Sequence, residues 1–153
     1  MIQVVRDLKR NTIVPFELRI EDARECEAMG VSPDQAIEDS VRQSLEAFQV
    51  ILDDEVICVW GYFPSSPLGH SCSVWMLSGE AANKHKIFLA RESRRLRDLL
   101  LKQFPCVVVM VDVRYIRSWN WLTKYLGFSR TGFCFNSPLG VPFEYLRLDR
   151  GMN

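Results

Sequence analysis

Three basic side chains open a helical pattern in the middle of the chain, where they could bind an anion. They are Lys84, His85 and Lys86, and the helical pattern runs from Asn83 to Phe104. The N-terminus of a helix attracts phosphate, because its free backbone N–H groups and the helix dipole are positive there. Basic side chains add to this attraction. The three residues are therefore candidates for phosphate binding, with a solvated first helical turn as the alternative.

A carboxylate stands at a second place where chemistry could occur. Asp112 comes directly after the continuous apolar run from Val107 to Val111, which is typical of a strand buried on both faces. Ligand sites of α/β proteins form at the carboxyl ends of such strands. Asp112 is therefore a candidate functional residue, and the alternative is that it caps the loop that follows.

The spacing of cysteine and histidine disfavours their chemistry. The chain has five cysteines and two histidines, without a C-x-x-C pair, so no metal site is predicted. Cys58 and Cys106 lie inside apolar runs and are predicted to be small core residues. A cysteine nucleophile would need a neighbouring base, for which only His70 and His85 are available.

Length and composition predict a single domain over residues 1–153. The chain has 153 residues, of which 48% are hydrophobic, enough to form a core. Its 19 basic and 19 acidic residues cancel, so charge gives no global reason to expect a nucleic-acid or membrane partner. No apolar run nears the ~20 residues that span a bilayer, and the start of the chain lacks a secretory pattern. We therefore expect a cytoplasmic protein. The basic run Arg91–Arg97 is predicted to be a solvated helix face, or else a local anion or nucleic-acid patch.

Periodicity and turn signals predict the elements in the order strand, two helices, three strands, helix, strand, short helix and two strands. Their ranges are Ile2–Arg6, Pro15–Met29, a helix capped by Ser32 with Ile37, Val41, Leu45 and Phe48 on one face, Phe48–Leu52, Val56–Phe63, Ser71–Leu77, Asn83–Phe104, Val107–Val111, a short helix that ends at Gly127, Gly132–Phe135 and Phe143–Leu148. Turns are predicted at Asp53-Asp54 and over Pro64–Gly69.

The predicted fold class is α/β (α+β), with one mixed sheet of about six to seven strands and helices on both faces. We expect Val74–Leu77 and Val107–Val111 to be adjacent parallel strands, because the helix between them is a crossover connection. Val109 and Val111 are expected to be buried.

The stretch from Cys106 to Phe133 combines a buried strand, a short helix, Leu126-Gly127-Phe128 and a new strand. This combination resembles the closing half of the GNAT (N-acetyltransferase) superfamily. The strand end Val74-Trp75-Met76-Leu77-Ser78-Gly79 looks like that of small GNAT-like proteins of tailed bacteriophages, some of which are internal virion proteins. The resemblance implies a GNAT-like domain.

In the family, acetyl-CoA pairs with the splayed end of the fourth strand, and a Gly-rich loop wraps its pyrophosphate. The resemblance therefore implies cofactor contacts at these residues: Met76, Leu77, Ser78, Asn83, Lys84, His85, Lys86 and Trp119. The loop here departs from the family, since it has one glycine, Gly79, and no Gly-x-Gly.

The family's catalytic side chains are also altered. The position of the tyrosine that acts as general acid holds Thr123, and that of a cofactor-contacting asparagine holds Ile116. Tyr125, two residues later, and Asp112 are the remaining catalytic candidates. No general base can be identified, although Glu46 and Glu55 are further available carboxylates.

Two functions follow as expectations. The first is a phage-type GNAT-like protein with a degenerate acyl-CoA site. Such a protein would have a structural or interaction role, with a protein as its partner, and could be associated with the virion. It would be found in the host cytoplasm or in the virion. The alternative is an active N-acyltransferase that moves an acetyl group from acetyl-CoA to an amine. Neither a metal, a membrane nor a nucleic acid is expected as a partner.

Overall fold

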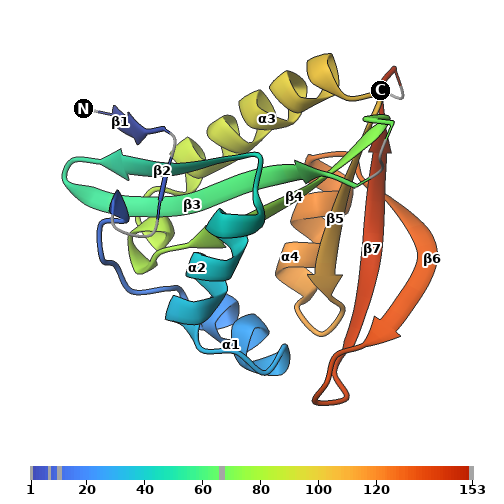
Figure 1. Ribbon diagram of the computed structural model, residues 1–153, viewed down its shortest axis with the longest axis horizontal. Helices are drawn as coiled ribbons and strands as arrows, with labels where there is room; N and C mark the ends of the chain where they lie inside the picture. Colours follow the sequence, from blue (N-terminus) through green and yellow to red (C-terminus); the bar gives the residue numbers. More distant parts are fainter. Residues whose placement is uncertain (1, 7, 10–11, 66–67, 152–153) are drawn as a thin grey trace.

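The chain folds around one mixed sheet of seven strands in the order β1-β2-β3-β4-β5-β7-β6, as Figure 1 shows. The computed structural model describes residues 2–6, 8–9, 12–65 and 68–151. Ser66 and Pro67, within the predicted turn before β4, lie outside the described residues. The sheet has one parallel pair, β4 with β5, and its other neighbouring strands are antiparallel.

The elements have the following bounds: β1 (Ile2–Val5), α1 (Ile20–Ala28), α2 (Pro33–Gln43), β2 (Glu46–Leu52), β3 (Glu55–Pro64), β4 (Ser71–Ser78), the 3₁₀ turn η2 (Glu80–Asn83), α3 (Lys86–Gln103), β5 (Cys106–Asp112), α4 (Ile116–Asn120), the π-helical segment η3 (Trp121–Tyr125), β6 (Ser129–Asn136) and β7 (Pro142–Asp149). The predicted α/β fold and the adjacent parallel strands are confirmed.

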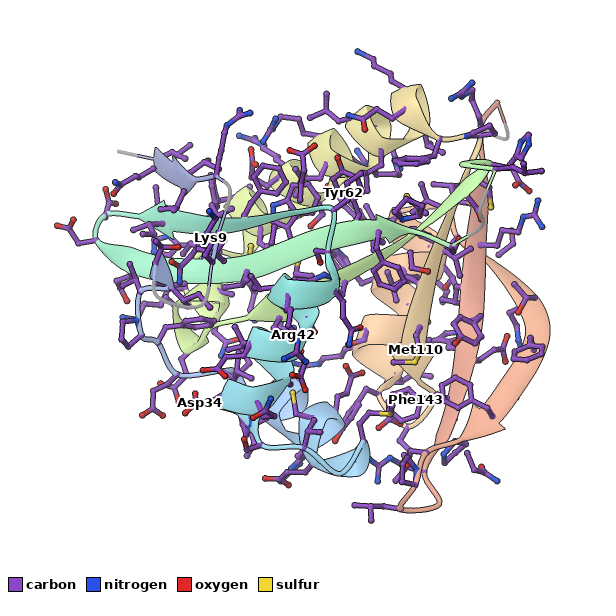
Figure 2. All side chains as sticks on the ribbon, viewed as in Figure 1. Lys9, Asp34, Arg42, Tyr62, Met110 and Phe143 are labelled. Carbon is purple, nitrogen blue, oxygen red and sulfur yellow. The ribbon has the colours of Figure 1, made fainter. Side chains whose placement is uncertain are left out.

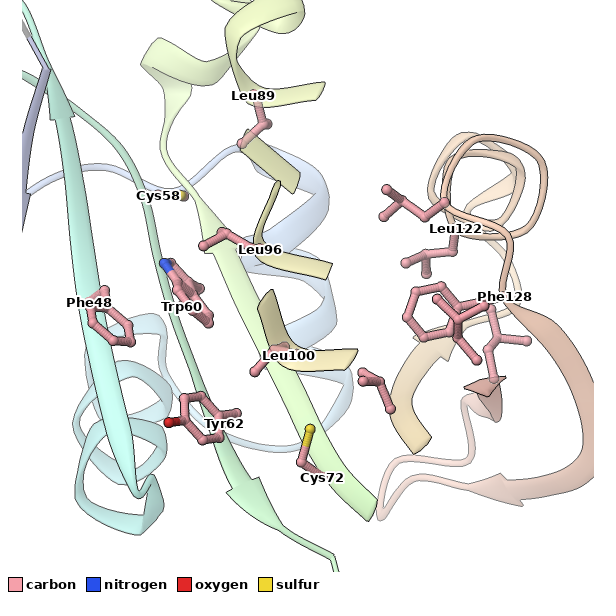
Figure 3. Close-up of a cluster of buried hydrophobic side chains, with 14 of the residues drawn as sticks. Phe48, Cys58, Trp60, Tyr62, Cys72, Leu89, Leu96, Leu100, Leu122 and Phe128 are labelled. Carbon is pink, nitrogen blue, oxygen red and sulfur yellow. The ribbon is translucent and has the colours of Figure 1, made fainter. Parts of the chain in front are cut away.

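Helices cover both faces of the sheet. On one face, α3, α4 and η3 bury the larger apolar cluster. Figure 3 shows its leucine stripe from α3 and the aromatic partners on β2 and β3: Leu89, Leu96, Leu100, Phe48, Trp60 and Tyr62. On the other face, Ile37 and Val41 of α2 pack against Ala47 and Val59. Burial of these two apolar clusters, one on each face of the sheet, stabilises the layered fold.

Several local signals act as predicted. The Ser32 hydroxyl accepts a hydrogen bond from the backbone N–H of Gln35 at 3.2 Å and caps α2. The Gln35 side chain does not complete a capping box, because it donates to Asp39 instead. Asp53 and Asp54 both have positive φ, as the tight turn between β2 and β3 requires.

The structure corrects three further predictions. The first helix begins at Ile20, not Pro15, because residues 17–19 are extended and pair with the end of β4. Leu45 is 63% exposed and precedes β2, so it does not continue the buried face of α2. The strand β5 is not buried on both faces: Val109 is half-buried against the larger cluster, whereas Met110, on the opposite face, is 37% exposed. That face of β5 stays open because α2 packs on β2 and β3.

Candidate functional site

The two parallel strands at the centre of the sheet pair only at their beginnings. Residues 71–73 of β4 pair with residues 106–108 of β5. Beyond this point the described ladder ends, although β4 continues to Ser78 and β5 to Asp112. Figure 1 shows the strands diverging toward their carboxyl ends. The result is a V-shaped opening in the sheet, bounded by the free edges of β4 and β5.

The free edge of β4 turns backbone groups toward this opening. Gly79 donates its N–H to Ile57 of β3, whereas Ser78 accepts from the N–H of Arg19 and donates to Asp22. Ser78 therefore faces away from β3. Because backbone groups alternate along a strand, Val74 and Met76 also direct their N–H and C=O groups toward the opening, and Leu77 directs its own toward β3.

Two carboxylates of α1 bridge the mouth of the opening. Asp22 Oδ2 accepts the N–H of Ser78, at the end of β4, at 2.6 Å. One helical turn later, Glu25 Oε1 lies 3.4 Å from the backbone nitrogen of Asp112, at the end of β5. Residues at i and i+3 share a helix face. The first turns of α1 thus hold the two diverging strand ends relative to each other.

Burial perturbs both of these carboxylates. It raises the pKa of Asp22, and the opposing charge of Arg19 limits that rise. For Glu25, burial and then the negative charge of Asp22 raise the pKa to about 7. Glu25 therefore exchanges a proton near neutral pH, as a general base must. The sequence had not singled it out, because α1 carries four acidic residues and nothing in their order marks one.

Asp112 has the geometry of a loop cap. Its carboxylate is completely buried. It accepts the backbone N–H of Arg114 at 2.9 Å and both forks of the Arg114 guanidinium, the shorter at 2.8 Å. A carboxylate held by this many donors is fixed in one orientation. A catalytic role for Asp112 remains a prediction.

The other carboxylates named from the sequence lie in ordinary pairs. Glu46 accepts the hydroxyl of Tyr62. Glu55 forms an exposed ion pair with Lys84, with Nζ and Oε2 3.3 Å apart.

Tyr125 and Trp119 lie on the α3 side of the sheet and are half-buried against the larger cluster. The guanidinium of Arg94 lies 4.1 Å above the Tyr125 ring, a cation–π contact. One turn further along α3, Arg97 donates to the backbone oxygen of Leu126 at 3.0 Å. Part of the predicted solvated face of α3 therefore holds η3.

The position of the family's acid is occupied by a satisfied hydroxyl. Thr123 donates to the backbone oxygen of Trp119 at 2.8 Å. The Trp119 ring in turn lies 5.2 Å from the guanidinium of Arg130. Tyr125, two residues after Thr123, carries a phenol on the same segment and lies beneath Arg94.

The predicted phosphate-binding turn lies between β4 and α3. Asn83, Lys84 and Lys86 are exposed there, and His85 is the residue before α3 but makes no side-chain cap. Gly79 has a packing role, because a Cβ atom would lie 2.7 Å from the backbone oxygen of Val56. Strand packing therefore explains the glycine at this position.

The described part of the chain contains no helix that is long and apolar enough to cross a membrane. Its residues also form no group of three or more His, Cys, Asp or Glu side chains that could hold a metal ion.

Comparison with known proteins gives structural relatives. No family model and no curated protein matches the sequence. Among solved structures, the chain is similar to an aminoglycoside acetyltransferase, AAC(6')-Ib, in complex with coenzyme A and kanamycin. That match has a TM-score of 0.63 at 14% identity and covers 98% of this chain and 95% of the other.

Two further solved structures agree. A GNAT acetyltransferase from Elizabethkingia anophelis with acetyl-CoA bound matches with a TM-score of 0.63 at 13% identity, over 97% of each chain. A probable acetyltransferase from Staphylococcus epidermidis has the same score and identity, over 97% of this chain and 99% of that one. At these identities the matches establish the fold alone: the chain has the GNAT acetyltransferase fold.

Proposed function

We propose that this chain binds an acyl-CoA thioester in the opening between β4 and β5 and transfers the acyl group to an amine. One observation carries the proposal: the described β4–β5 ladder stops at residues 73 and 108, with Glu25 at the mouth of the opening. The solved relatives named with coenzyme A and kanamycin support it, because they share this fold.

The strand edge fits the amide-rich pantetheine arm of an acyl-CoA. Val74 and Met76 can each donate an N–H and accept at a C=O, as an added strand would require. An N–H directed at the thioester oxygen would also stabilise the oxyanion that forms during attack. The backbone groups of Ser78 are already hydrogen-bonded to Arg19 and Asp22. The acyl-CoA is therefore limited to the part of β4 that precedes Ser78.

Glu25 is the proposed general base. The amine nitrogen forms a bond to the thioester carbonyl carbon, Glu25 takes the proton that the nitrogen loses, and the carbon–sulfur bond breaks. The sulfur leaves as a thiolate and is then protonated, by Tyr125 or by water. A carboxylate with a pKa of about 7 can accept a proton at neutral pH and release it to solvent afterwards.

The turn before α3 fits the nucleotide less well. It has side chains where a glycine loop would bring bare N–H groups to the pyrophosphate. Lys84 also shares its charge with Glu55. We therefore propose weak donor binding, with Asn83, His85 and Lys86 as surface contacts.

A second candidate function is favoured by how the site is closed. The chain's own residues 17–22 cover the outer edge of β4, and Arg94 and Arg97 connect α3 to η3. These contacts fit a GNAT-fold protein that binds a protein partner and has lost acyl transfer. A virion-associated role and a cytoplasmic location remain predictions that rest on the sequence.

A thiol-release assay with acetyl-CoA and a panel of primary amines separates these functions, alongside calorimetric titration with acetyl-CoA. Amine-dependent release of CoA that Glu25→Gln suppresses supports acyl transfer. Binding without release, or neither, contradicts it and favours the protein-binding role.

A further inference from the structure

An aromatic surface lies on the open face of β5, β7 and β6. Alternation along β7 places Leu146 and Leu148 in the larger core, so Phe143 and Tyr145 face the other way. The register places Met110 opposite Tyr145, and Phe135 opposite Phe143. Phe133 lies near Tyr145, with ring centroids 5.5 Å apart. We call these five residues the aromatic face.

The rings of the aromatic face form a continuous layer. Phe135 stacks on Phe143, with centroids 5.7 Å apart, and lies 5.4 Å from Tyr145. Phe143 is buried beneath its neighbours, whereas Phe133 is 63% exposed and Met110 is 37% exposed. Figure 2 shows Met110 and Phe143 together on the side of the sheet away from α4. Contiguous exposed apolar residues of this kind mark binding surfaces.

The aromatic face begins beside the proposed base. Glu25 contacts the backbone of Asp112, and Asp112 pairs with Phe143 on the next strand. Neighbouring strands lie ~4.8 Å apart. A ligand whose amine reaches Glu25 can therefore rest its remaining atoms on Phe135 and Tyr145, which lie beside the buried Phe143.

The surrounding charges fit one cation. The arginines that flank the face are Arg114, paired with Asp112, and Arg147, paired with Asp149. Each pair is formally neutral, so neither carboxylate is left to bind a second positive charge on a ligand. Glu25, which contacts the end of β5, can attract an amine.

From this arrangement we infer that the acceptor is a monoamine attached to an aromatic or similarly flat apolar group, bound with its amine at Glu25 and its ring on the aromatic face. The inference rests on the acyl transfer proposed above and specifies its substrate class. It separates this chain from the AAC(6')-Ib complex with kanamycin, because a polycationic aminoglycoside would not match this surface.

Two measurements test the inference. Steady-state acyl transfer is compared for phenethylamine, spermidine and kanamycin, with the wild type, Phe133→Ser and the control Leu45→Ser. Phe133 and Leu45 are equally exposed, at 63%, but Leu45 lies outside the aromatic face. We expect kcat/KM for phenethylamine to exceed that for spermidine at least ~10-fold. Phe133→Ser should raise its KM by about 3–10-fold, as loss of one aromatic contact predicts, and Leu45→Ser should not.

The second measurement needs no turnover. Titration of ¹⁵N-labelled protein with phenethylamine should shift amide resonances of residues 110–112 and 133–145, and Phe133→Ser should weaken that binding without changing acetyl-CoA affinity. Binding of phenethylamine without CoA release would support the substrate surface while refuting the proposed catalysis. Equal use of spermidine or kanamycin would overturn the inference. So would a wild-type dimer in sedimentation that Phe133→Ser dissociates, because the face would then be covered by a second copy.

Discussion

Glu25 combines a contact to the end of β5 with a carboxyl that titrates near neutrality. As a general base it must be ionised, so we expect kcat/KM to rise with pH through about 7. Glu25→Gln should lower the rate by roughly 10²–10⁴-fold and remove this rise. A pH–rate profile of both proteins is the measurement, with Glu27→Gln as the control on the exposed side of α1. An unchanged profile in Glu25→Gln would assign the base elsewhere.

Glu25 should affect the stability of the fold in the opposite direction to its effect on the rate. The pKa of Glu25 is raised from 4.5 to about 7 in the folded protein. The folded state therefore holds this proton more tightly, and the contribution is fully present below pH 4.5 and lost as pH rises through about 7. Glu25→Gln should thus increase the free energy of unfolding at pH 8 by about 1–3 kcal/mol and leave it nearly unchanged at pH 4. Urea denaturation at the two pH values measures this. A loss of stability at pH 8 would mean that Glu25 is ionised and structural.

For single residues, the sequence predicted where candidate side chains lie in the chain better than it predicted what they do. It marked Asp112 and the turn Lys84–Lys86, because type and place in a pattern can be read locally. It could not mark Glu25, because its raised pKa depends first on burial in the folded protein, which no local pattern records. Nor could it show that Asp112 is held by Arg114.

Among the elements, β5 has one covered and one open face. Val111 is 2% exposed and packs into the larger cluster, whereas the adjacent Met110 is 37% exposed. Val111→Asp should destabilise the fold by several kcal/mol, since an unpaired carboxylate would enter the core. Met110→Asp should cost much less. Thermal unfolding of the two variants compares the faces directly, and equal losses of stability would show β5 to be covered on both.

Two neighbouring residues of β4 direct their backbone groups to opposite sides, so proline at each should have a different effect. Met76 directs its N–H to the opening, and Leu77 directs its own to the ladder with β3. Met76→Pro should therefore abolish acetyl-CoA binding and leave a folded protein with some loss of packing. Leu77→Pro should unfold it, because proline removes a ladder bond there. Circular dichroism and titration measure both effects. Donor binding retained in Met76→Pro would move the acyl-CoA site away from this strand edge.

The elements also show where sequence patterns failed. Residues 17–19 are helix-compatible, yet they are extended because Glu17 and Arg19 pair with Glu80 and Ser78, about 60 positions away. Leu45 continues the period of α2, but the chain leaves the helix before it. Both errors arise where a long-range backbone contact decides the conformation, which no local period can record.

At the scale of the whole molecule, the order of elements was sufficient for the fold. A crossover helix between two apolar runs requires parallel neighbours, and β4 and β5 are indeed the parallel pair. The residues around the opening between β4 and β5 differ in how well they fit the proposed acyl transfer. In the proposed function the strand edge and Glu25 serve acyl transfer, whereas the turn before α3 has a single glycine, Gly79, where a nucleotide-binding loop would have several.

This division predicts how the molecule distinguishes acyl donors. We expect acetyl-CoA to bind with a dissociation constant of about 100 µM or higher, because two or three lost N–H contacts to pyrophosphate, at ~1.5–3 kcal/mol each, weaken binding more than a hundredfold. Since the pantetheine arm supplies most of what remains, S-acetylpantetheine should bind within about tenfold of acetyl-CoA. Calorimetric titration with both donors measures the ratio. Low-micromolar acetyl-CoA binding that is more than a hundredfold tighter than S-acetylpantetheine, and that Lys84→Ala and Lys86→Ala weaken, would show instead that the basic turn replaces the glycine loop.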